Sequence, residues 1–520
     1  MHSLLDDALL TVRYPDEEPH AATLPQVLAQ LSESDITSFD ALQPHQEQAW
    51  YSFLVQLAAV TAAREFAAET AADTPTEPAT WRNALIDLAG GEAAWHLVVD
   101  DLSQPAFLQS PVPEGDLDEP GYKEDVPTPD RLDVLVTSKN HDVKRTRIAR
   151  PRPEHWIYAL CTLQTMEGFL GRGNYGIVRM NGGFGNRPLV GLAPELTWGK
   201  RFRRDLDVLL SERDTLGDAY DLTGPALTWT EPWNGQKDDA LPLAECDPYF
   251  IEICRRIRLI DRGDGIECAR ANTKGQRIDA PDDLNGVTKD PWTPVEKSDV
   301  KALTLGGSGF TYRRLQEIFF GGEYASPPAL QFQEGEHGGA YLIAQAMVRG
   351  QGKTDGLHHR VVFVPNTVKR RFLQRPETKE QAAERARTRV ALADQVQSRV
   401  LYPAVAALLG SGDGDEVDYE DAAPWIEAFD EAVDEQFFDA LWTSVEEEMS
   451  NQEARAHWET LLWREAEQVF HEAERSTPIA DNRRWRARSR ARSLFYGSAA
   501  QVFETAPYTS DTSESDESNR

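Results

Sequence analysis

NYGIVRMNGGFGNRPLVGL spans Asn174 to Leu192, and VLVTSKNH spans Val134 to His141 upstream of it. The glycines of the downstream stretch allow a backbone with positive φ that approaches another molecule closely. Peptide N–H groups, two amides and a guanidinium are concentrated in the seven residues from Asn181 to Arg187, and phosphate or base-edge recognition needs such donors. The alternative is an ordinary β-turn with solvated side chains. The candidate DNA-contacting residues of this glycine loop are Asn181, Gly182, Gly183, Gly185, Asn186 and Arg187.

A basic run begins within the upstream stretch at Lys139 and continues to Arg152, in a chain that is otherwise acidic. The formal net charge is −32, so a local inversion of charge predicts a polyanion-binding face, because the field at the contact matters more than the total. Asp142 is the acid within the run. Its basic residues are Lys139, Lys144, Arg145, Arg147, Arg150 and Arg152, and Asn140 lies among them as a further candidate contact.

Hydrophobic periodicity around the glycine loop predicts a mixed α and β domain. We expect helices at 24–31, 45–69, 81–88, 155–170, 200–210 and 315–320. We expect strands at 7–14, 188–192, 226–231, 249–260, 341–349 and 357–365, with a loop at 350–356 between the last two. Residues 261–300 are polar and read as a long irregular insertion.

After Arg375 the composition changes to long amphipathic segments rich in Ala, Leu, Glu and Arg, at 377–409, 422–448, 451–475 and 480–504. Their short connections predict an antiparallel four-helix bundle. The predicted fold class is therefore α+β, with a mixed globular domain at 1–375 and a bundle at 376–505. Residues 506–520 are acidic and Ser-rich, and we expect them to be disordered.

The last of these segments carries a basic stripe. Arg484, Arg488 and Arg492 stand at i, i+4 and i+8, where one helix face collects them, and Arg483, Arg486 and Arg490 lie alongside. The stripe is a candidate nucleic-acid or subunit contact. It is equally consistent with pairing to acidic faces of neighbouring helices, at Glu446 to Glu448, Glu465 and Glu467.

The common motifs of catalysis are missing from the sequence. There is no phosphate-binding P-loop, no HExxH metal motif and no GxSxG nucleophile elbow. The four cysteines contain no CxxC pair, so we expect reduced thiols and no bound metal or cofactor. Met1 to Tyr14 lacks a basic start before an apolar core, and no apolar run is long enough to span a membrane, so a cytoplasmic location is expected.

Several motifs in a fixed order resemble the CasA family, the large subunit of the type I-E CRISPR surveillance complex Cascade. They are the LPQVLA opening, Phe107-Leu108-Gln109, TLQTMEGFLG, the glycine loop, Leu227-Thr228-Trp229, Asp290-Pro291-Trp292-Thr293-Pro294, the 350–356 loop and the C-terminal helices. The glycine loop reads NGGFGNRP, shorter than the family's glycine-rich string, and the paired cysteines of some members are missing. The motif that the loop reads is therefore left open.

The resemblance implies a non-catalytic subunit that reads the protospacer-adjacent motif from the minor groove of duplex DNA. It implies that a glycine loop, a lysine-bearing finger and a polar wedge begin strand separation, so that crRNA pairing and an R-loop follow. Partners would be the crRNA-bearing Cascade subunits, double-stranded target DNA and a helicase-nuclease. The finger matches Lys274, the wedge matches Gln351 and Lys353, and the run from Lys139 to Arg152 matches a loop that contacts the crRNA handle and neighbouring subunits.

Two other functions stay open. A stand-alone metal-dependent nuclease would use Asn140, His141 and Asp142 with distant acids. An acidic scaffold would bind another protein through the bundle, with arginines that pair only internally.

Overall fold

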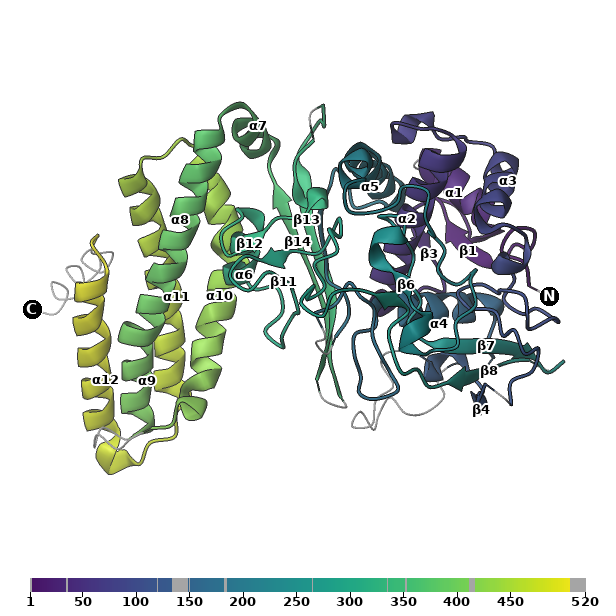
Figure 1. Cartoon of the computed structure of the whole chain (residues 1–520). Helices are drawn as coiled ribbons and strands as arrows, with labels where there is room; N and C mark the ends of the chain where they lie inside the picture. Colours follow the sequence, from purple (N-terminus) through teal and green to yellow (C-terminus); the bar gives the residue numbers. More distant parts are fainter. Residues whose placement is uncertain are drawn as a thin grey trace, which may run out of the picture. The chain divides into compact units, whose positions relative to one another are not determined.

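The computed structural model describes residues 2–33, 36–118, 120–132, 148, 150–181, 185–263, 265–333, 335–350, 353–410 and 417–505. The chain divides into two compact units (Figure 1). Unit 1 comprises residues 1–310 and 321–363, and unit 2 comprises residues 311–320 and 364–520. The sequence predicts a boundary at Arg375, whereas the boundary in the structure follows Phe363. The earlier segment 311–320 also belongs to unit 2.

Unit 1 is built around a helix that is buried on every side. Its residues from Gln48 to Ala62 are all buried, which confirms the predicted buried helix. Trp50 stacks on Phe53 and meets Tyr158 edge to face, an arrangement that favours aromatic packing. The helices of this unit are α1 (Leu24–Glu33), α2 (Glu47–Glu65), α3 (Pro78–Ala89), α4 (Pro153–Met166) and α5 (Trp198–Arg213).

The strands of this unit form small sheets, and β13 and β14 are much longer than the other strands. The sheet orders are β2-β1-β3, β4-β8-β7, β14-β13-β5 and β11-β10-β12, with a parallel pair of β6 and β9. The first strands are β1 (Leu10–Arg13), β2 (His20–Ala22), β3 (Ser38–Phe39), β4 (Lys123–Val126), β5 (Leu189–Ala193), β6 (Leu241–Pro242) and β7 (Arg256–Asp261). The later ones are β8 (Ile266–Ala271), β9 (Ile278–Asp279), β10 (Val295–Glu296), β11 (Lys301–Ala302), β12 (Tyr324–Ala325), β13 (Ala340–Gly350) and β14 (Lys353–Val364).

Several predicted elements of unit 1 are wrong. Residues 226–231 form no strand, only a single bridge from Leu227 to Ile251, and only the second half of 249–260 is a strand. The segment 261–300 holds β8, β9 and β10. The predicted loop at 350–356 is shorter, because β14 already begins at Lys353. Buried polar side chains order the segment before β7, since Gln164 accepts from the backbone N–H groups of Cys254 and Arg255.

Unit 2 is a helical bundle, as predicted (Figure 1). A π-helical segment at Val396–Leu401 joins α8 to α9, which makes them one long bundle member. Pro403 follows directly; it lacks an N–H and cannot complete a regular helical ladder. The helices are α6 (Tyr312–Phe319), α7 (Asn366–Gln374), α8 (Pro376–Gln395), α9 (Tyr402–Leu409), α10 (Tyr419–Glu446), α11 (Asn451–Ser476) and α12 (Asp481–Val502).

The short helix α6 belongs to unit 2 because its side chains bind the bundle. Arg313 pairs with Asp394 at 2.8 Å and also with Asp430. The Tyr312 ring lies 4.8 Å from that of Phe437. Among the described residues, no helix is both long and apolar enough to cross a bilayer.

Candidate nucleic-acid interface

The described end of the glycine loop is fixed to the β13–β14 hairpin. Gly185 bridges Val348, and the Asn186 N–H donates to the Met347 carbonyl at 2.9 Å. Gly185 has φ +136°, and a Cβ there would lie 3.2 Å from the Met347 oxygen. Glycine is therefore required at this close approach. The described end of the glycine loop therefore lies along β13, whereas Gly182, Gly183 and Gln351 lie outside the described residues.

Asn181, at the start of the loop, has its amide engaged within unit 1. Its Nδ2 donates to the Ala302 carbonyl at 2.7 Å, and its Oδ1 accepts from the Thr304 hydroxyl at 2.6 Å. This side chain therefore anchors the loop to the segment after β11. The bond to Ala302 uses one of the two hydrogens on Nδ2, so the predicted role of this amide as a donor to DNA would depend on the other hydrogen.

Arg187 and Asn186 are buried, which corrects the prediction that they contact DNA. Arg187 is 1% exposed, its Nε lies 2.6 Å from Asp290 Oδ2, and its Nη1 donates to Gln56 Oε1 at 3.2 Å. Asn186 is 2% exposed. Arg187 is a core residue because its charge is met by a buried carboxylate, and an unpaired buried guanidinium would be costly.

Arg187 is part of a wider buried charge cluster. Arg179 also reaches Asp290, at 3.4 Å, and burial opposes the charge on Asp290, but the two arginines hold its pKa below the usual value. Glu252 lies nearby and accepts the Val178 N–H at 2.9 Å. Burial raises the pKa of Glu252 to about 8, so this carboxyl is largely protonated at neutral pH.

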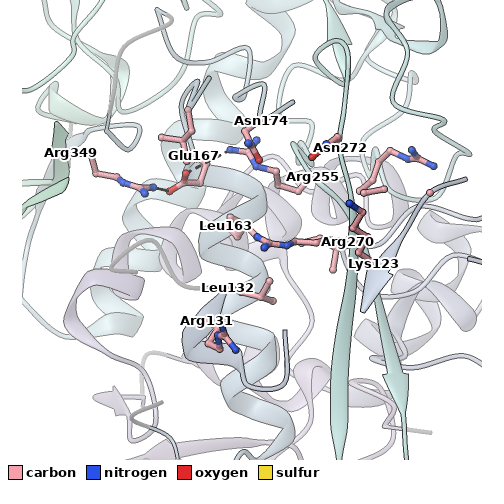
Figure 2. Close-up of a pocket in the computed structure, with 15 residues that line it drawn as sticks. Lys123, Arg131, Leu132, Leu163, Glu167, Asn174, Arg255, Arg270, Asn272 and Arg349 are labelled. Atoms are coloured by element: carbon pink, nitrogen blue, oxygen red, sulfur yellow. Dashed lines mark hydrogen bonds and ion pairs between the residues drawn. The ribbon is translucent and has the colours of Figure 1, made fainter. Parts of the chain in front are cut away.

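A basic pocket of about 410 Å³ lies beside the end of the glycine loop (Figure 2). It is formed by the C-terminal end of α4, the strands β4, β7 and β8, and the last residues of β13. Glu167 is the acid of its lining, bound by Arg349 and 3.8 Å from Arg255. The cations of the lining are Lys123, Arg131, Arg255, Arg256, Arg270 and Arg349.

Donor capacity in this pocket exceeds what the protein itself uses. Arg255 Nη2 and Arg256 Nε are buried and make no hydrogen bond within the described part of the chain. Lys123, Arg131 and Arg270 are exposed at the pocket. Guanidinium groups in such a cluster suit phosphate oxygens. Counting charges along the sequence missed this site, because its cations come from segments far apart in the chain.

Lys274 is exposed on the loop after β8. Its N–H donates to the Gly235 carbonyl at 2.7 Å, and the N–H of Thr273 donates to the Gly173 carbonyl at 3.2 Å. Asn272, two residues earlier, lines the basic pocket. The predicted finger lysine and the pocket therefore belong to one surface region. Of Lys353 the structure describes only the backbone, at the start of β14.

The remaining predicted contacts fall into two groups. Lys139, Asn140, Lys144, Arg145 and Arg147 lie outside the described residues, together with the nuclease candidates His141 and Asp142. In the bundle stripe, Arg492 pairs with Glu474 of α11 at 2.7 Å, Arg488 donates to the Glu474 carbonyl, and Arg484 pairs with Asp481 at 2.7 Å. These three arginines therefore pair with protein groups, and the acidic residues that they contact are Glu474 and Asp481.

The described residues hold no group of three or more His, Cys, Asp or Glu side chains arranged for a metal ion. The four cysteines are buried and make no disulfide.

The family model described as CRISPR-associated protein Cse1 matches residues 3–469. The chain belongs to the Cse1 family. A search of curated proteins found no match. Among solved structures, Thermus thermophilus CasA (Cse1) is 15% identical with a TM-score of 0.63, and covers 96% of this chain and 99% of its own. Cse1 from Acidimicrobium ferrooxidans is 19% identical with a TM-score of 0.61, covering 96% and 98%.

A chain from a structure titled "CRISPR RNA-guided surveillance complex" is 12% identical to this Cse1-family chain, with a TM-score of 0.60. The match covers 95% of this chain and 99% of that one. At these identities the likeness establishes a shared fold over nearly the full length of both chains.

Proposed function

We propose that this chain is the large, non-catalytic subunit of a type I-E Cascade complex. In this role it reads the protospacer-adjacent motif in duplex DNA, starts strand separation for crRNA pairing and recruits the helicase-nuclease. Membership of the Cse1 family supports the assignment, as does the full-length likeness to a chain of an RNA-guided surveillance complex.

One structural observation carries the DNA-reading part of the proposal. The bridge from Gly185 to Val348 joins the glycine loop to the hairpin, and the ion pair of Glu167 with Arg349 joins that hairpin to the basic pocket. The described end of the glycine loop, the last residues of β13 and the cations of the basic pocket are therefore close together. We assign the glycine loop to the groove and the exposed pocket cations to backbone phosphates, because phosphate contacts position a protein and groove contacts specify sequence.

A reader of this kind is expected to tolerate several related motifs. The minor groove presents a degenerate pattern that distinguishes chiefly A·T from G·C. Strand exchange into an RNA–DNA hybrid is close to balanced, and one stacking step is worth about 1.4 kcal/mol, so a small wedge suffices to tip it.

The test is reconstitution with the other Cascade subunits and crRNA, followed by measurement of target-duplex binding with and without this chain. The triple variant Lys274→Ala, Gln351→Ala, Lys353→Ala should weaken motif-dependent binding roughly tenfold or more while assembly is kept. Lys200→Ala, an exposed lysine of α5, is the matched control. Equal target binding with and without the chain would falsify the proposal, and loss of assembly in the triple variant would show that these residues are structural.

A further inference from the structure

A second pocket, of about 350 Å³, lies in unit 2 between α8 and α11. Its polar lining includes Arg385, Arg389, Asn451 and Arg455, and the ring of Trp458 forms part of its wall. The proposed DNA-reading role uses none of these side chains.

Arg389 is the unusual member of this lining. It is 3% exposed, and neither Nη1 nor Nη2 finds a hydrogen-bond partner among the described residues. The guanidinium lies 5.2 Å over the Trp458 ring, whose Nε1 donates to the Arg389 carbonyl at 3.1 Å. Burial, with a contribution from Arg385, lowers the pKa of Arg389 to about 9. A buried charge without a counterion is costly, so a guanidinium held this way needs an anion.

The acidic residue of the lining, Glu384, does not supply that anion, and the other two arginines of the lining have partners of their own. Arg385 donates to neutral oxygens, of Asn451 at 3.1 Å and of the Ser444 carbonyl at 3.1 Å. Glu384 pairs with Arg387 at 2.8 Å. Arg455 is already met by Glu459 at 2.9 Å and by Glu504 at 3.1 Å.

The end of the described chain is fixed beside this pocket. The N–H and hydroxyl of Thr505 both donate to Glu459 Oε2 at 2.8 Å, and Glu459 follows Trp458 directly. The sequence then continues through 506–520, which carries Asp511, Glu514, Asp516 and Glu517. Six extended residues from Thr505 to Asp511 reach about 20 Å, so these carboxylates are within range of the pocket.

We propose that the α8–α11 pocket is a carboxylate-binding site centred on Arg389, and that it is filled by an acidic side chain of residues 506–520. The planar guanidinium fork binds a carboxylate through two parallel hydrogen bonds. Trp458 covers one face of the guanidinium by a cation–π contact, and the carboxylate would bind at its in-plane edge.

The experiment uses the full chain with photo-crosslinking benzoylphenylalanine at Tyr508 and thermal unfolding as the second readout. We expect crosslinks to peptides of α8 or α11, lost when Asp511, Glu514, Asp516 and Glu517 are replaced by their amides. That neutralised chain should unfold about 2–4 °C lower. In an Arg389→Met background the same neutralisation should have no further effect. The charge-matched control replaces four exposed acids of α10, namely Glu427, Glu431, Glu435 and Asp439.

Arg389→Lys serves if the methionine variant does not fold, because it keeps the charge but loses the fork, and crosslinking should fall. Crosslinks that avoid both helices overturn the proposal, as does a neutralised chain that unfolds at the parent temperature. A neutralised chain that unfolds equally early with and without Arg389 also overturns it. Capture of an added acidic peptide by a pocket that the segment itself does not reach contradicts the assigned occupant. These readouts need neither DNA nor the other subunits, so their failure is separate from failure of the Cascade assignment.

Discussion

One of the buried clusters of ionisable residues in unit 1 consists of Arg179, Arg187, Glu252 and Asp290. Asp290 pairs with both arginines, whereas the carboxyl group of Glu252 accepts a hydrogen bond from the Val178 backbone N–H. The two carboxyl groups are therefore pushed in opposite directions, with a lowered pKa at Asp290 and a raised pKa at Glu252. Breaking such a cluster by removing one partner leaves an uncompensated charge, which is strongly destabilising.

Glu252 gives a prediction for pH dependence. Its pKa is raised from 4.5 to about 8 on folding, so the folded chain holds a proton that the unfolded chain releases. Its contribution to stability is complete below about pH 4.5 and is lost as the pH rises towards 8. Glu252→Gln should therefore remove a decline on the order of 1 kcal/mol per pH unit across this window. Urea unfolding of both chains from pH 5 to 8 measures it, and parallel curves would contradict it.

The sequence reveals residue types at this scale but not their partners. Arg187 stands at the exit of a glycine loop, and an arginine there is exposed more often than buried. Its counterion, Asp290, is distant in the sequence, and no spacing rule connects them. The same limit applied to Arg389, which reads as one of many arginines on an amphipathic helix until its burial is known.

At the scale of elements, the junction of the glycine loop with β13 sets the geometry of the candidate interface. The strand β13 pairs with β5 from Tyr341 opposite Ala193 to Gln345 opposite Leu189. Beyond that ladder, Gly185 and Asn186 continue the contact along Met347 and Val348. The strand β13 of the hairpin is therefore attached both to β5 and to the described end of the glycine loop.

Gly185→Val tests this junction. The added Cβ would press on the Met347 oxygen, and valine is strained at φ +136°. We expect a loss of about 1–3 kcal/mol in unfolding free energy, with faster amide exchange at Asn186 and slower target binding in the assembled complex. Gly306→Ala is the control, because its Cβ would meet nothing within 4 Å and its φ is not in the glycine region. Equal exchange in the two variants would show that the junction is not rigid.

Long helices followed directly from periodicity, since α2, α10, α11 and α12 each have enough turns for the pattern to dominate. The strands of two residues did not, because so short a segment carries no period. The apolar composition of 249–255 predicts a strand, but the backbone N–H groups of Cys254 and Arg255 donate to the side chain of Gln164. A buried segment has the same composition whether its N–H groups bond to a neighbouring strand or to a side chain.

For the whole molecule, a net charge of −32 coexists with a pocket lined by six cations. Salt should therefore act in opposite directions on folding and on nucleic-acid binding. Self-repulsion of the acidic chain is screened by added salt, whereas phosphate contacts are weakened by it.

We expect the melting temperature of the free chain to rise by a few degrees between 50 and 200 mM NaCl, while target binding by the assembled complex weakens. Lys123→Ala with Arg270→Ala should reduce the slope of log affinity against log salt by about 2, since each phosphate contact contributes nearly one unit. Differential scanning fluorimetry and a salt titration of duplex binding measure the two effects. An unchanged slope would remove these two side chains from the interface.

The folding of unit 2 must wait, because its first helix, α6, is synthesised well before the rest of the unit. Because α6 is encoded ahead of residues 321–363 but is anchored to Asp394 and Asp430, it leaves the ribosome long before its partners exist. At about 5 to 20 residues per second, the roughly one hundred residues from α6 to the start of α10 take about 5 to 20 s. During that interval Tyr312 and Phe319 have no bundle to cover them. If the gene were divided after residue 363, α6 would be part of the N-terminal product although it belongs to unit 2. A split version of the protein therefore needs a second copy of α6 on the C-terminal piece.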